Sequence, residues 1–429
     1  MSSEQPILIA IIGGGLGGSA LARALMRNPR LDVHVYESNA TFSERGASIG
    51  LANNAQRALA QVDPDDPELL KRADAVVHSS MRVVMGTGPQ AGTVVSDLHT
   101  APQEAERLPR VSLHRGSLLR ELIAGLPKER LHTSKRLVSL KVLPDSRVVE
   151  ITFGDGESAI CDAVIGADGI WGMVRQHVLG DAAEEHAPAN AGWWDCRNLV
   201  PYEKAREVLG DKLFQVDRAY GWAGDGAFIM HVVLENRKLV MCIASVLEHS
   251  PPQDAKKRPL TRDMLTDAFG TWMDGPIAKG IIELIMDQPT PQLQRYALYE
   301  HKTTPTYANG PVCIMGDAAH AATPWQASGG GQAFEDAMIL GALLGCIPSA
   351  DQVPTAFKIY DEVRRPRAQK ILDSSRASGM ILCGADQTVG LDIDKMRTEL
   401  SARAALAEEV DLAVYKEDAV ERLIQVLEM

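Results

Sequence analysis

Paired cysteines, long apolar runs and an excess of positive charge are all missing from this sequence of 429 residues. The six cysteines are scattered without a C-x-x-C pair, which argues against a disulfide or zinc framework, and we expect no metal site. No apolar run reaches membrane-spanning length, and only six residues precede the first apolar segment, so we expect no signal peptide. The formal net charge of −12 argues against nucleic acid or an anionic membrane surface as the main partner. We therefore expect a soluble, cytoplasmic protein, and this charge does not exclude small anionic substrates.

The strongest pattern lies in the first 37 residues. A β-branched apolar run predicts a buried strand, and a helical pattern and a second strand follow it. Three glycines at G-x-G-x-x-G spacing stand between the first strand and the helix, and an acidic residue ends the second strand. In chain order the pattern consists of Ile7–Ile12, Gly13, Gly15, Gly18, Leu31–Tyr36 and Glu37.

Each part of this pattern has a mechanical purpose in dinucleotide binding. Gly13 permits the tight turn, Gly15 lets a pyrophosphate approach the backbone, and Gly18 lets helix and strand pack closely. The helix start offers unpaired N–H groups to the phosphates, and Glu37 can accept hydrogen bonds from an adenosine ribose. An ordinary strand-to-helix turn would not need all these parts in this order, so we infer a bound dinucleotide.

Two more predicted strands end in glycine and acid, at Asp168-Gly169 and at Gly316-Asp317. Ligands of open α/β sheets lie outside the carboxyl ends of the strands. Either acid alone is typical of a plain turn or a helix cap. Together with Gly13, they predict three strand ends converging on one ligand.

The chain is long for a single core, so two domains are expected. The element pattern predicts one strand over 159–167, a helical segment over 263–287 and a helical tail over 392–428. It also predicts a helix from about residue 51 with Asn53 or Asn54 as its N-cap, and a long helix around Pro366.

Four motifs make the chain resemble the single-component FAD-dependent aromatic hydroxylases of the para-hydroxybenzoate hydroxylase type, most closely the salicylate hydroxylase-like branch. They are the glycine turn with Glu37, His114-Arg115, residues 165–169 and residues 316–336; the run Arg364-Arg-Pro-Arg367 is also familiar. The resemblance implies an α/β fold: a Rossmann-like FAD-binding domain (GR2-type), an inserted mixed-sheet substrate domain and C-terminal helices. The expected limits are 1–75, 108–180 and 293–380 for the FAD-binding domain, 76–107 and 181–292 for the substrate domain, and 381–429 for the tail.

The resemblance also implies roles for individual residues. Arg115 would lie along the ribose and pyrophosphate of FAD, and Asp168 with Gly169 would serve the pyrophosphate side. Asp317 would bind the ribitol hydroxyls. Backbone N–H groups near Gly329 and Gly330 would face the flavin ring at its N1–C2=O edge. Ala47, in the loop after Glu37, completes the expected FAD contacts.

Three positions within residues 316–336 bear on what the resemblance implies. The family often has glycine where this chain has Ala327, and often histidine where it has Trp325. The local turn is therefore expected to differ, and no histidine is available there for a substrate carboxylate. His320 belongs to the motif as a structural residue.

The substrate side rests on two candidates. Period-two alternation puts Asp195 and Arg197 on one sheet face, and relatives approach substrate with an arginine at this place, so Arg197 is the candidate for holding a phenolate or carboxylate. A surface pair with Asp195 is the equally weighted alternative. His231 has a suitable intrinsic pKa for a base that deprotonates a phenol, although membership of the sheet core is the commoner role. Tyr220 is more often core as well.

The resemblance implies a monooxygenase in which NADH or NADPH reduces FAD and a flavin C4a-hydroperoxide hydroxylates a small phenolic acid. The expected reaction is decarboxylative hydroxylation of a salicylate-like ortho-hydroxybenzoate to a catechol, with O2 as co-substrate. The alternatives are hydroxylation or dearomatisation of another phenol, such as a polyketide-derived one, and a flavin-linked dehydrogenase. Whether the protein is a monomer or a homodimer stays open.

Overall fold

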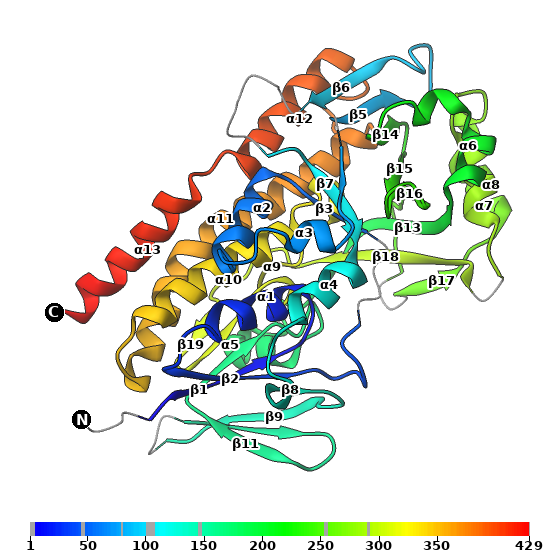
Figure 1. Ribbon diagram of the computed structural model, residues 1–429. Helices are drawn as coiled ribbons and strands as arrows, with labels where there is room; N and C mark the ends of the chain where they lie inside the picture. Colours follow the sequence, from blue (N-terminus) through cyan, green and yellow to red (C-terminus); the bar gives the residue numbers. More distant parts are fainter. Residues whose placement is uncertain are drawn as a thin grey trace.

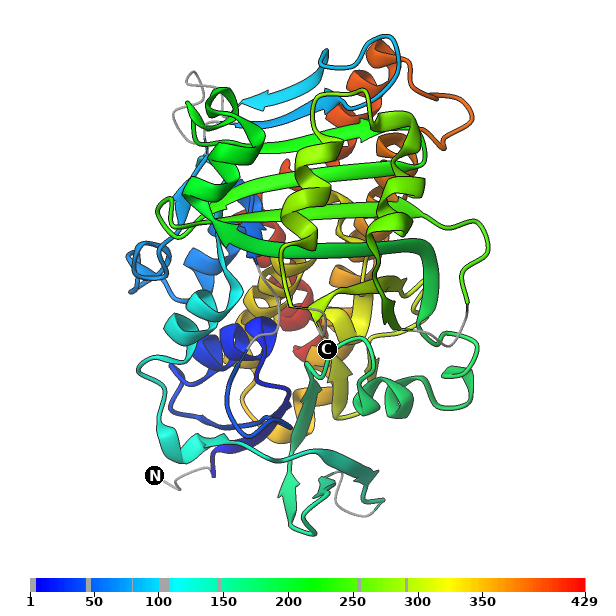
Figure 2. The same ribbon diagram turned by 90° about the vertical axis from the view of Figure 1, so that its right-hand side faces the viewer.

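A computed structural model describes residues 5–43, 48–78, 80–99, 108–144, 148–252, 256–289 and 292–428. Two large sheets dominate it. One carries the N-terminal strands in the lower part of Figure 1, and the other lies at the upper right and fills the upper half of Figure 2. Within the described residues, no helix combines the length and the hydrophobicity needed to cross a membrane.

The first sheet has six strands, and all neighbouring pairs are parallel except β19–β20. In spatial order these are β19 (Ala308–Asn309), β20 (Val312–Ile314), β12 (Ala163–Gly166), β1 (Ile7–Ile12), β2 (Leu31–Tyr36) and β8 (Leu131–His132). The central strands are almost fully buried apolar runs, as parallel strands covered on both faces require.

Register brings the ends of the central strands to one level. Ile12 of β1 pairs with Gly166 of β12, and Gly166 pairs with Ile314 of β20. On the other side, Ile12 pairs with Tyr36 of β2. The residues that follow these strands therefore emerge along a single sheet edge, as the strand-end pattern predicted.

The second sheet has eight strands and is mixed, because β14–β5 is parallel and the other pairs are antiparallel. Its order is β17 (Lys257–Pro259), β18 (Gln294–Glu300), β13 (Ala189–Pro201), β16 (Leu239–Leu247), β15 (Ala227–Leu234), β14 (Ala219–Gly224), β5 (Ser80–Met85) and β6 (Val94–His99). One face packs on α6 (Tyr202–Leu209), α7 (Arg262–Ala268) and α8 (Ala278–Met286), the helices in front of the sheet in Figure 2. The other face turns toward the first sheet.

Two small antiparallel sheets complete the strands: β11 (Ser158–Cys161), β10 (Val149–Phe153) and β9 (Leu137–Val142), and β3 (Ser48–Leu51), β7 (Val111–His114) and β4 (Val76–Val77). The single strand predicted over 159–167 is wrong, because β11 and β12 belong to different sheets. Asp162 separates them: its carboxylate accepts a hydrogen bond from Leu8 N at 2.8 Å, and its own N–H donates to Leu8 O.

The remaining helices are α1 (Leu16–Leu25), α2 (Asn53–Val62), α3 (Leu69–Arg72), α4 (Arg115–Ile123), α5 (Met173–Leu179), α9 (Asp317–His320), α10 (Gly329–Cys346), α11 (Val353–Leu382), α12 (Ile393–Glu408) and α13 (Leu412–Leu427). The first half of α10 is buried nearly all round between its neighbours. Pro366 lies inside α11 but does not end it, and the whole helix is 30 residues long.

Three helical predictions need correction. The segment 263–287 forms two helices, α7 and α8, because a 3-10 turn (Gly270–Trp272) interrupts it. The tail forms α12 and α13, because the Asp411 side chain accepts hydrogen bonds from the N–H groups of Ala413 and Val414 and so begins a new helix. Neither Asn53 nor Asn54 caps α2, whose N-cap position is Ala52.

Candidate active site

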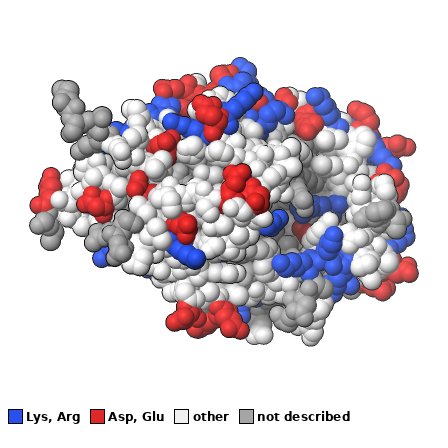
Figure 3. Space-filling view, turned by 90° about the horizontal axis from the view of Figure 1, so that it is seen from below, with Lys and Arg blue, Asp and Glu red and all other residues white. Residues whose placement is uncertain are grey.

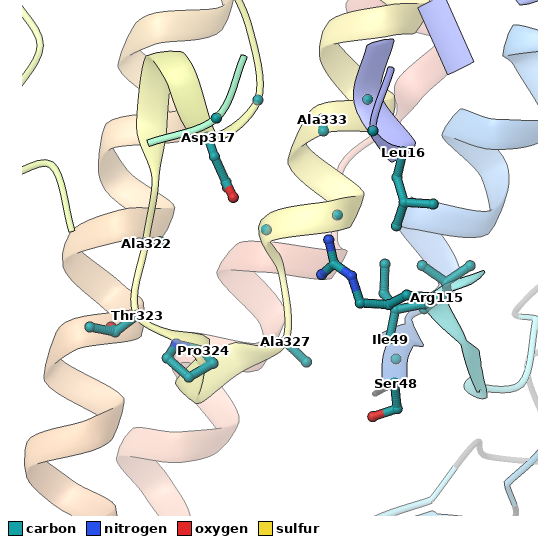
Figure 4. Close-up of a pocket in the computed structure, with 18 of the residues that line it drawn as sticks. Leu16, Ser48, Ile49, Arg115, Asp317, Ala322, Thr323, Pro324, Ala327 and Ala333 are labelled. Atoms are coloured by element: carbon teal, nitrogen blue, oxygen red, sulfur yellow. The ribbon is translucent and has the colours of Figure 1, made fainter. Parts of the chain in front are cut away.

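A cavity of about 1040 Å³ lies between the level strand ends of the first sheet and the free face of the second. Its lining comes from both sheets and from α1, α4, α10, α11 and α12. Figure 4 shows one part of it, with the start of α10 facing Leu16, Ile49 and Arg115. Small-ligand sites are commonly 300–1,000 Å³, so this cavity has room for a large ligand together with a small one.

The glycine turn is built so that side chains are excluded. Gly13 has φ +109°, and a Cβ there would lie 2.3 Å from the Ala167 carbonyl oxygen. A Cβ on Gly18 would lie 2.0 Å from the Gly13 carbonyl oxygen, which shows how closely α1 approaches the turn. The N-cap residue of α1, Gly15, has no side chain to block the approach of a ligand, and helix starts favour anions.

Glu37 lies beside this turn with its carboxylate held in place. One oxygen accepts a hydrogen bond from Gly14 N at 2.9 Å, and the other accepts one from Asn39 N at 2.7 Å. Glu37 is buried and lines the cavity. The carboxylate is therefore oriented by the backbone before any ligand binds.

Arg115 opens α4 directly after β7, as the sequence predicted. Figure 4 shows its side chain extending into the cavity. Its guanidinium is suited to phosphate because it presents several fixed N–H donors.

Asp168 follows β12 and faces two ways. Its Oδ2 accepts a hydrogen bond from Val174 N at 3.1 Å, which holds the start of α5. Its Oδ1 is buried without a hydrogen-bond partner among the described residues. Burial raises the pKa of Asp168 to about 6. The next residue, Gly169, has φ +78° with open space around it, and both residues line the cavity.

Asp317 follows β20 at the start of α9, exposed to the cavity. A buried polar network holds the backbone beneath it: Asp336 accepts hydrogen bonds from Gly316 N at 2.8 Å and from His320 Nε2 at 2.6 Å. His320 is 4% exposed and does not line the cavity. Its role here is structural, as expected.

Two arginines complete this network. Arg364 Nε donates to Asp336 at 2.7 Å, and its Nη1 donates to Glu335 at 2.8 Å. Arg367 makes two further bonds to Glu335. Burial raises the pKa of Asp336, but its interactions with His320 and Arg364 outweigh this effect and hold that pKa well below its ordinary value.

The start of α10 borders the cavity through Gly329 and Gly330. Space is open around Gly329, whereas a Cβ on Gly330 would lie 2.4 Å from Ile49 Cδ1. No side chain caps this helix start, so its N–H groups are also left for a ligand. Ala327 keeps the left-handed conformation, at φ +52°. A non-glycine residue thus adopts a conformation that ordinarily favours glycine.

Trp325 forms part of the cavity wall. It packs edge-on against Trp193 and Phe228, with ring centroids 5.4 Å and 5.7 Å apart. Gly379 of α11 makes room for it, because a Cβ there would lie 2.3 Å from the indole nitrogen. Trp325 thus contributes an aromatic surface to the cavity wall.

Arg197 and Asp195 both face the cavity from β13, as the period-two pattern predicted. The Arg197 guanidinium lies over the Tyr296 ring, 5.6 Å from its centroid. Among the described residues it forms no ion pair with Asp195. The expected alternative, a surface pair, is therefore not what the structure shows.

His231 points to the opposite face of the second sheet and does not line the cavity. It is 1% exposed and stacks on Tyr220, with centroids 5.0 Å apart, beside Trp222. Burial lowers the pKa of His231 to about 3. The structure does not bring it to the site as a base; it belongs to the sheet core, together with Tyr220.

The structure therefore gathers most of the predicted site residues on one cavity. These are Gly13, Gly15, Glu37, Arg115, Asp168, Gly169, Asp317, Gly329, Gly330 and Arg197. Gly18 lies behind the glycine turn, His231 lies on the far side of the second sheet, and Ala47 lies outside the described residues.

Some cavity residues were not predicted as functional. His78 is buried in the lining, where its Nε2 is hydrogen-bonded to Ser112 and burial lowers its pKa to about 4. No sequence pattern singled it out. Asp195 did have a signal, because it directly follows two tryptophans in a predicted strand and carboxylates are seldom buried.

Comparison with known proteins agrees with this geometry. A family model described as an FAD binding domain matches residues 7–375. The chain is 32% identical to 6-methylsalicylate 1-monooxygenase of Aspergillus terreus, over 100% of this chain and 95% of that protein. The chain belongs to the FAD-dependent monooxygenase family. This chain is also 33% identical to an FAD-dependent monooxygenase of Aspergillus niger, over 94% of this chain and 93% of that protein.

Among solved structures, one described as a salicylate hydroxylase substrate complex matches this chain with a TM-score of 0.82 at 26% identity. The match covers 97% of this chain and 99% of that one. These findings confirm the resemblance drawn from the motifs, the α/β fold and FAD as the cofactor.

The cavity fits FAD on its own features. Two helix starts border it, and the turn at Gly13 leaves no room for a Cβ. One oxygen of Asp168 has no hydrogen-bond partner in the described parts of the chain. Anions bind well at helix starts, and carboxylates suit ribose and ribitol hydroxyls.

Proposed function

We propose that this monooxygenase hydroxylates a salicylate-like ortho-hydroxybenzoate with loss of carbon dioxide to give a catechol, using NADH or NADPH and O2. The observation that carries the proposal is Arg197, a cavity-facing guanidinium stacked on Tyr296. Such a group can hold the phenolate or carboxylate of a small acid. The relative that acts on 6-methylsalicylate supports the same substrate class.

The FAD contacts belong to the proposal as well. The Gly13–Gly15 turn and the start of α1 would hold the pyrophosphate, with Glu37 on the ribose and Arg115 alongside. Asp317 would bind the ribitol hydroxyls, and the start of α10 would face the flavin ring. When bound, FAD supplies the redox chemistry with which this family activates oxygen.

The protein's own part in the reaction is positioning and exclusion of water. The wall beyond Arg197 is apolar, formed by Phe228, Met230 and Ile243 from β15 and β16 together with Trp325. A ring held between this wall and the cofactor is oriented and shielded from solvent. The charge of Arg197 stabilises the ionised ring hydroxyl that makes the ring carbon electron-rich.

The direct test incubates FAD-loaded protein with salicylate and NADH, then with NADPH. We expect substrate-dependent oxygen uptake, catechol and carbon dioxide. A dihydroxybenzoate that retains its carboxylate would overturn decarboxylation and leave simple ring hydroxylation. Nicotinamide oxidation without oxygen uptake would instead show a flavin-linked dehydrogenase.

Arg197 can be tested against a matched arginine of the same sheet. Arg295 lies over Trp194 at 5.5 Å, does not line the cavity, and serves as the control. We expect Arg197→Gln to raise the KM for salicylate at least about tenfold, since a charge-assisted bond contributes 1.5–3 kcal/mol. Arg295→Gln should leave that KM nearly unchanged. Equal effects would remove Arg197 from the substrate site.

A larger phenol is the second candidate, because Met230 and Met241 give the cavity wall side chains that adapt to different ring shapes. A panel of phenols that includes substituted resorcinols tests this candidate: a higher kcat/KM for one of them than for salicylate would support it.

Partners and compartment complete the proposal. We propose a small aromatic acid and O2 as substrates, and a cytoplasmic protein that is a monomer or homodimer. Figure 3 shows basic side chains gathered beside a hollow on the face seen from below, although the chain as a whole carries a net charge of −12. Local positive charge of this kind is compatible with small anionic ligands.

A further inference from the structure

Asp195 is a buried carboxyl group that has no hydrogen-bond partner within the part of the chain that the structure describes. It is 7% exposed, lies in the middle of β13 and lines the cavity. Its Oδ1 has no hydrogen-bond partner among the described residues. Leaving such a group unpaired in a protein interior is costly, so packing alone does not explain it.

The residues around Asp195 do not neutralise it either. Its cross-strand neighbours are Ser245 on β16 and Tyr296 on β18, neither of which is positively charged. Among the residues that the structure describes, the charged group that acts on its pKa is Arg197, two residues along β13. Burial raises the pKa of Asp195, and the charge of Arg197 lowers it by a smaller amount.

The spacing of Asp195 and Arg197 matches two ends of one small polar ligand. Residues two apart on a strand are about 6.6 Å apart along it, and both side chains face the cavity. Because the Arg197 guanidinium is stacked on Tyr296, it lies beside Asp195 without closing an ion pair. A ligand that offers a hydrogen to one side chain and negative charge to the other satisfies both.

We propose that Asp195 accepts the ring-hydroxyl proton of the substrate, so that the phenolate forms beside Arg197. This inference rests on the proposed function and names the base that it requires. The O–H bond of the ring hydroxyl breaks, its electron pair stays on the ring oxygen, and the proton moves to a carboxylate oxygen of Asp195. No oxidation or reduction occurs in this step, and the proton returns when the neutral product forms.

The test uses a phenolic acid whose ionisation can be seen. The FAD-loaded protein is mixed without nicotinamide with 2-hydroxy-5-nitrobenzoate, whose phenolate absorbs visible light, near neutral pH. We compare wild type with Asp195→Asn, which keeps the shape but cannot take the proton. His231→Gln is the matched control, because it alters a buried polar group on the opposite face of the same sheet.

We expect wild type and His231→Gln to bind the probe as phenolate and Asp195→Asn to bind it as neutral phenol. With salicylate and NADH, Asp195→Asn should lose about 100-fold or more in kcat/KM. With the nitro probe as substrate, its activity should recover as the pH passes the pKa of the probe's own hydroxyl. A merely structural role would not give this recovery. If Asp195→Asn retains no FAD, Asp195→Ser takes its place.

Each other outcome is informative. Equal ionisation of the probe in wild type and Asp195→Asn would overturn the role of Asp195 and leave the proposed function standing. Loss of ionisation in His231→Gln alone would also overturn the role of Asp195. Failure of FAD-loaded wild type to bind any hydroxybenzoate would overturn the proposed function, and this inference with it.

Discussion

Replacing Arg364 by leucine should destabilise the protein far more than replacing the arginine next to it. Arg364 is fully buried and bonds two buried carboxylates, Asp336 at 2.7 Å and Glu335 at 2.8 Å. Removing one partner of a buried charge pair costs about 3–5 kcal/mol, because the other charge stays uncompensated. We expect the lower end, since Arg367 and His320 remain bonded to the carboxylates.

Arg365→Leu is the control for this prediction. Arg365 pairs with Asp361 one turn away at 2.7 Å, but its side chain is 33% exposed. Exposed pairs of this kind contribute about 0.3–0.5 kcal/mol. The two variants therefore remove the same functional group from adjacent positions, and they differ in burial and partners.

Guanidinium unfolding followed by circular dichroism and by flavin release measures both variants. We expect Arg364→Leu to lower the free energy of unfolding by about 3 kcal/mol and to weaken FAD retention, because Asp336 holds the backbone of Gly316 beside Asp317. The double variant Arg364→Leu with Asp336→Asn should be less damaging than the sum of the two. A loss no larger than that of Arg365→Leu would refute the reasoning.

Three further predictions concern the cofactor end of the cavity. Gly18→Ala should cost about 1–3 kcal/mol through overpacking against Gly13 and lower the bound FAD per chain, whereas Gly345→Ala, which has open space around it, should leave FAD content unchanged. Ala327→Gly should raise the free energy of unfolding by about 0.5 kcal/mol, because relief of left-handed backbone strain exceeds the entropy that glycine adds to the unfolded chain. A melting temperature below that of wild type would contradict this. The pKa of Asp168 is raised by burial to about 6, so its contribution to stability is present below about pH 4 and is lost as pH rises through about 6. Asp168→Asn in FAD-free protein should therefore gain stability relative to wild type between these limits, and parallel pH profiles of unfolding would count against it.

The sequence predicted correctly that the residues after the central strands share one cavity, because local rules apply there. Glycines that exclude a Cβ, such as Gly13, and acids that follow buried strands, such as Asp168 and Asp317, are required by close backbone approach and by level strand ends. Both requirements act over a few residues of chain, so they leave a readable pattern.

The substrate end was harder to predict because it depends on which face of a strand meets which layer. Arg197 and His231 both lie in strands whose side chains point alternately to the two faces of the sheet, but only Arg197 is on the face that lines the cavity. Alternation gives two faces without saying which one is covered by helices. The same limit hid Asp195, whose lack of a partner is visible only once the neighbouring strands are in place.

Helix ends were the least predictable part of the fold. Asn54 has a side chain suited to capping α2, yet it donates to Glu335 from across the core instead. The hydrophobic pattern of the tail continues through Asp411, yet α12 ends at Glu408 and α13 begins after Asp411. In both cases side-chain hydrogen bonds decided the outcome: a tertiary bond for Asn54 and two local bonds for Asp411.

The unbroken course of α11 links the two ends of the cavity mechanically. Tyr360 bonds the backbone of β20 near one end of the helix, and Ser375 bonds the backbone of Thr323 further along. Ser378 and Leu382 then form cavity wall. A helix of 30 residues is a rod about 45 Å long. The number of residues between Tyr360 and Ser378 therefore sets the position of that wall relative to the nucleotide-binding sheet. One residue inserted between Tyr360 and Ser375 would swing that wall by about 100° around the rod axis, which makes the length of this segment as much a determinant of pocket shape as any side chain that faces it.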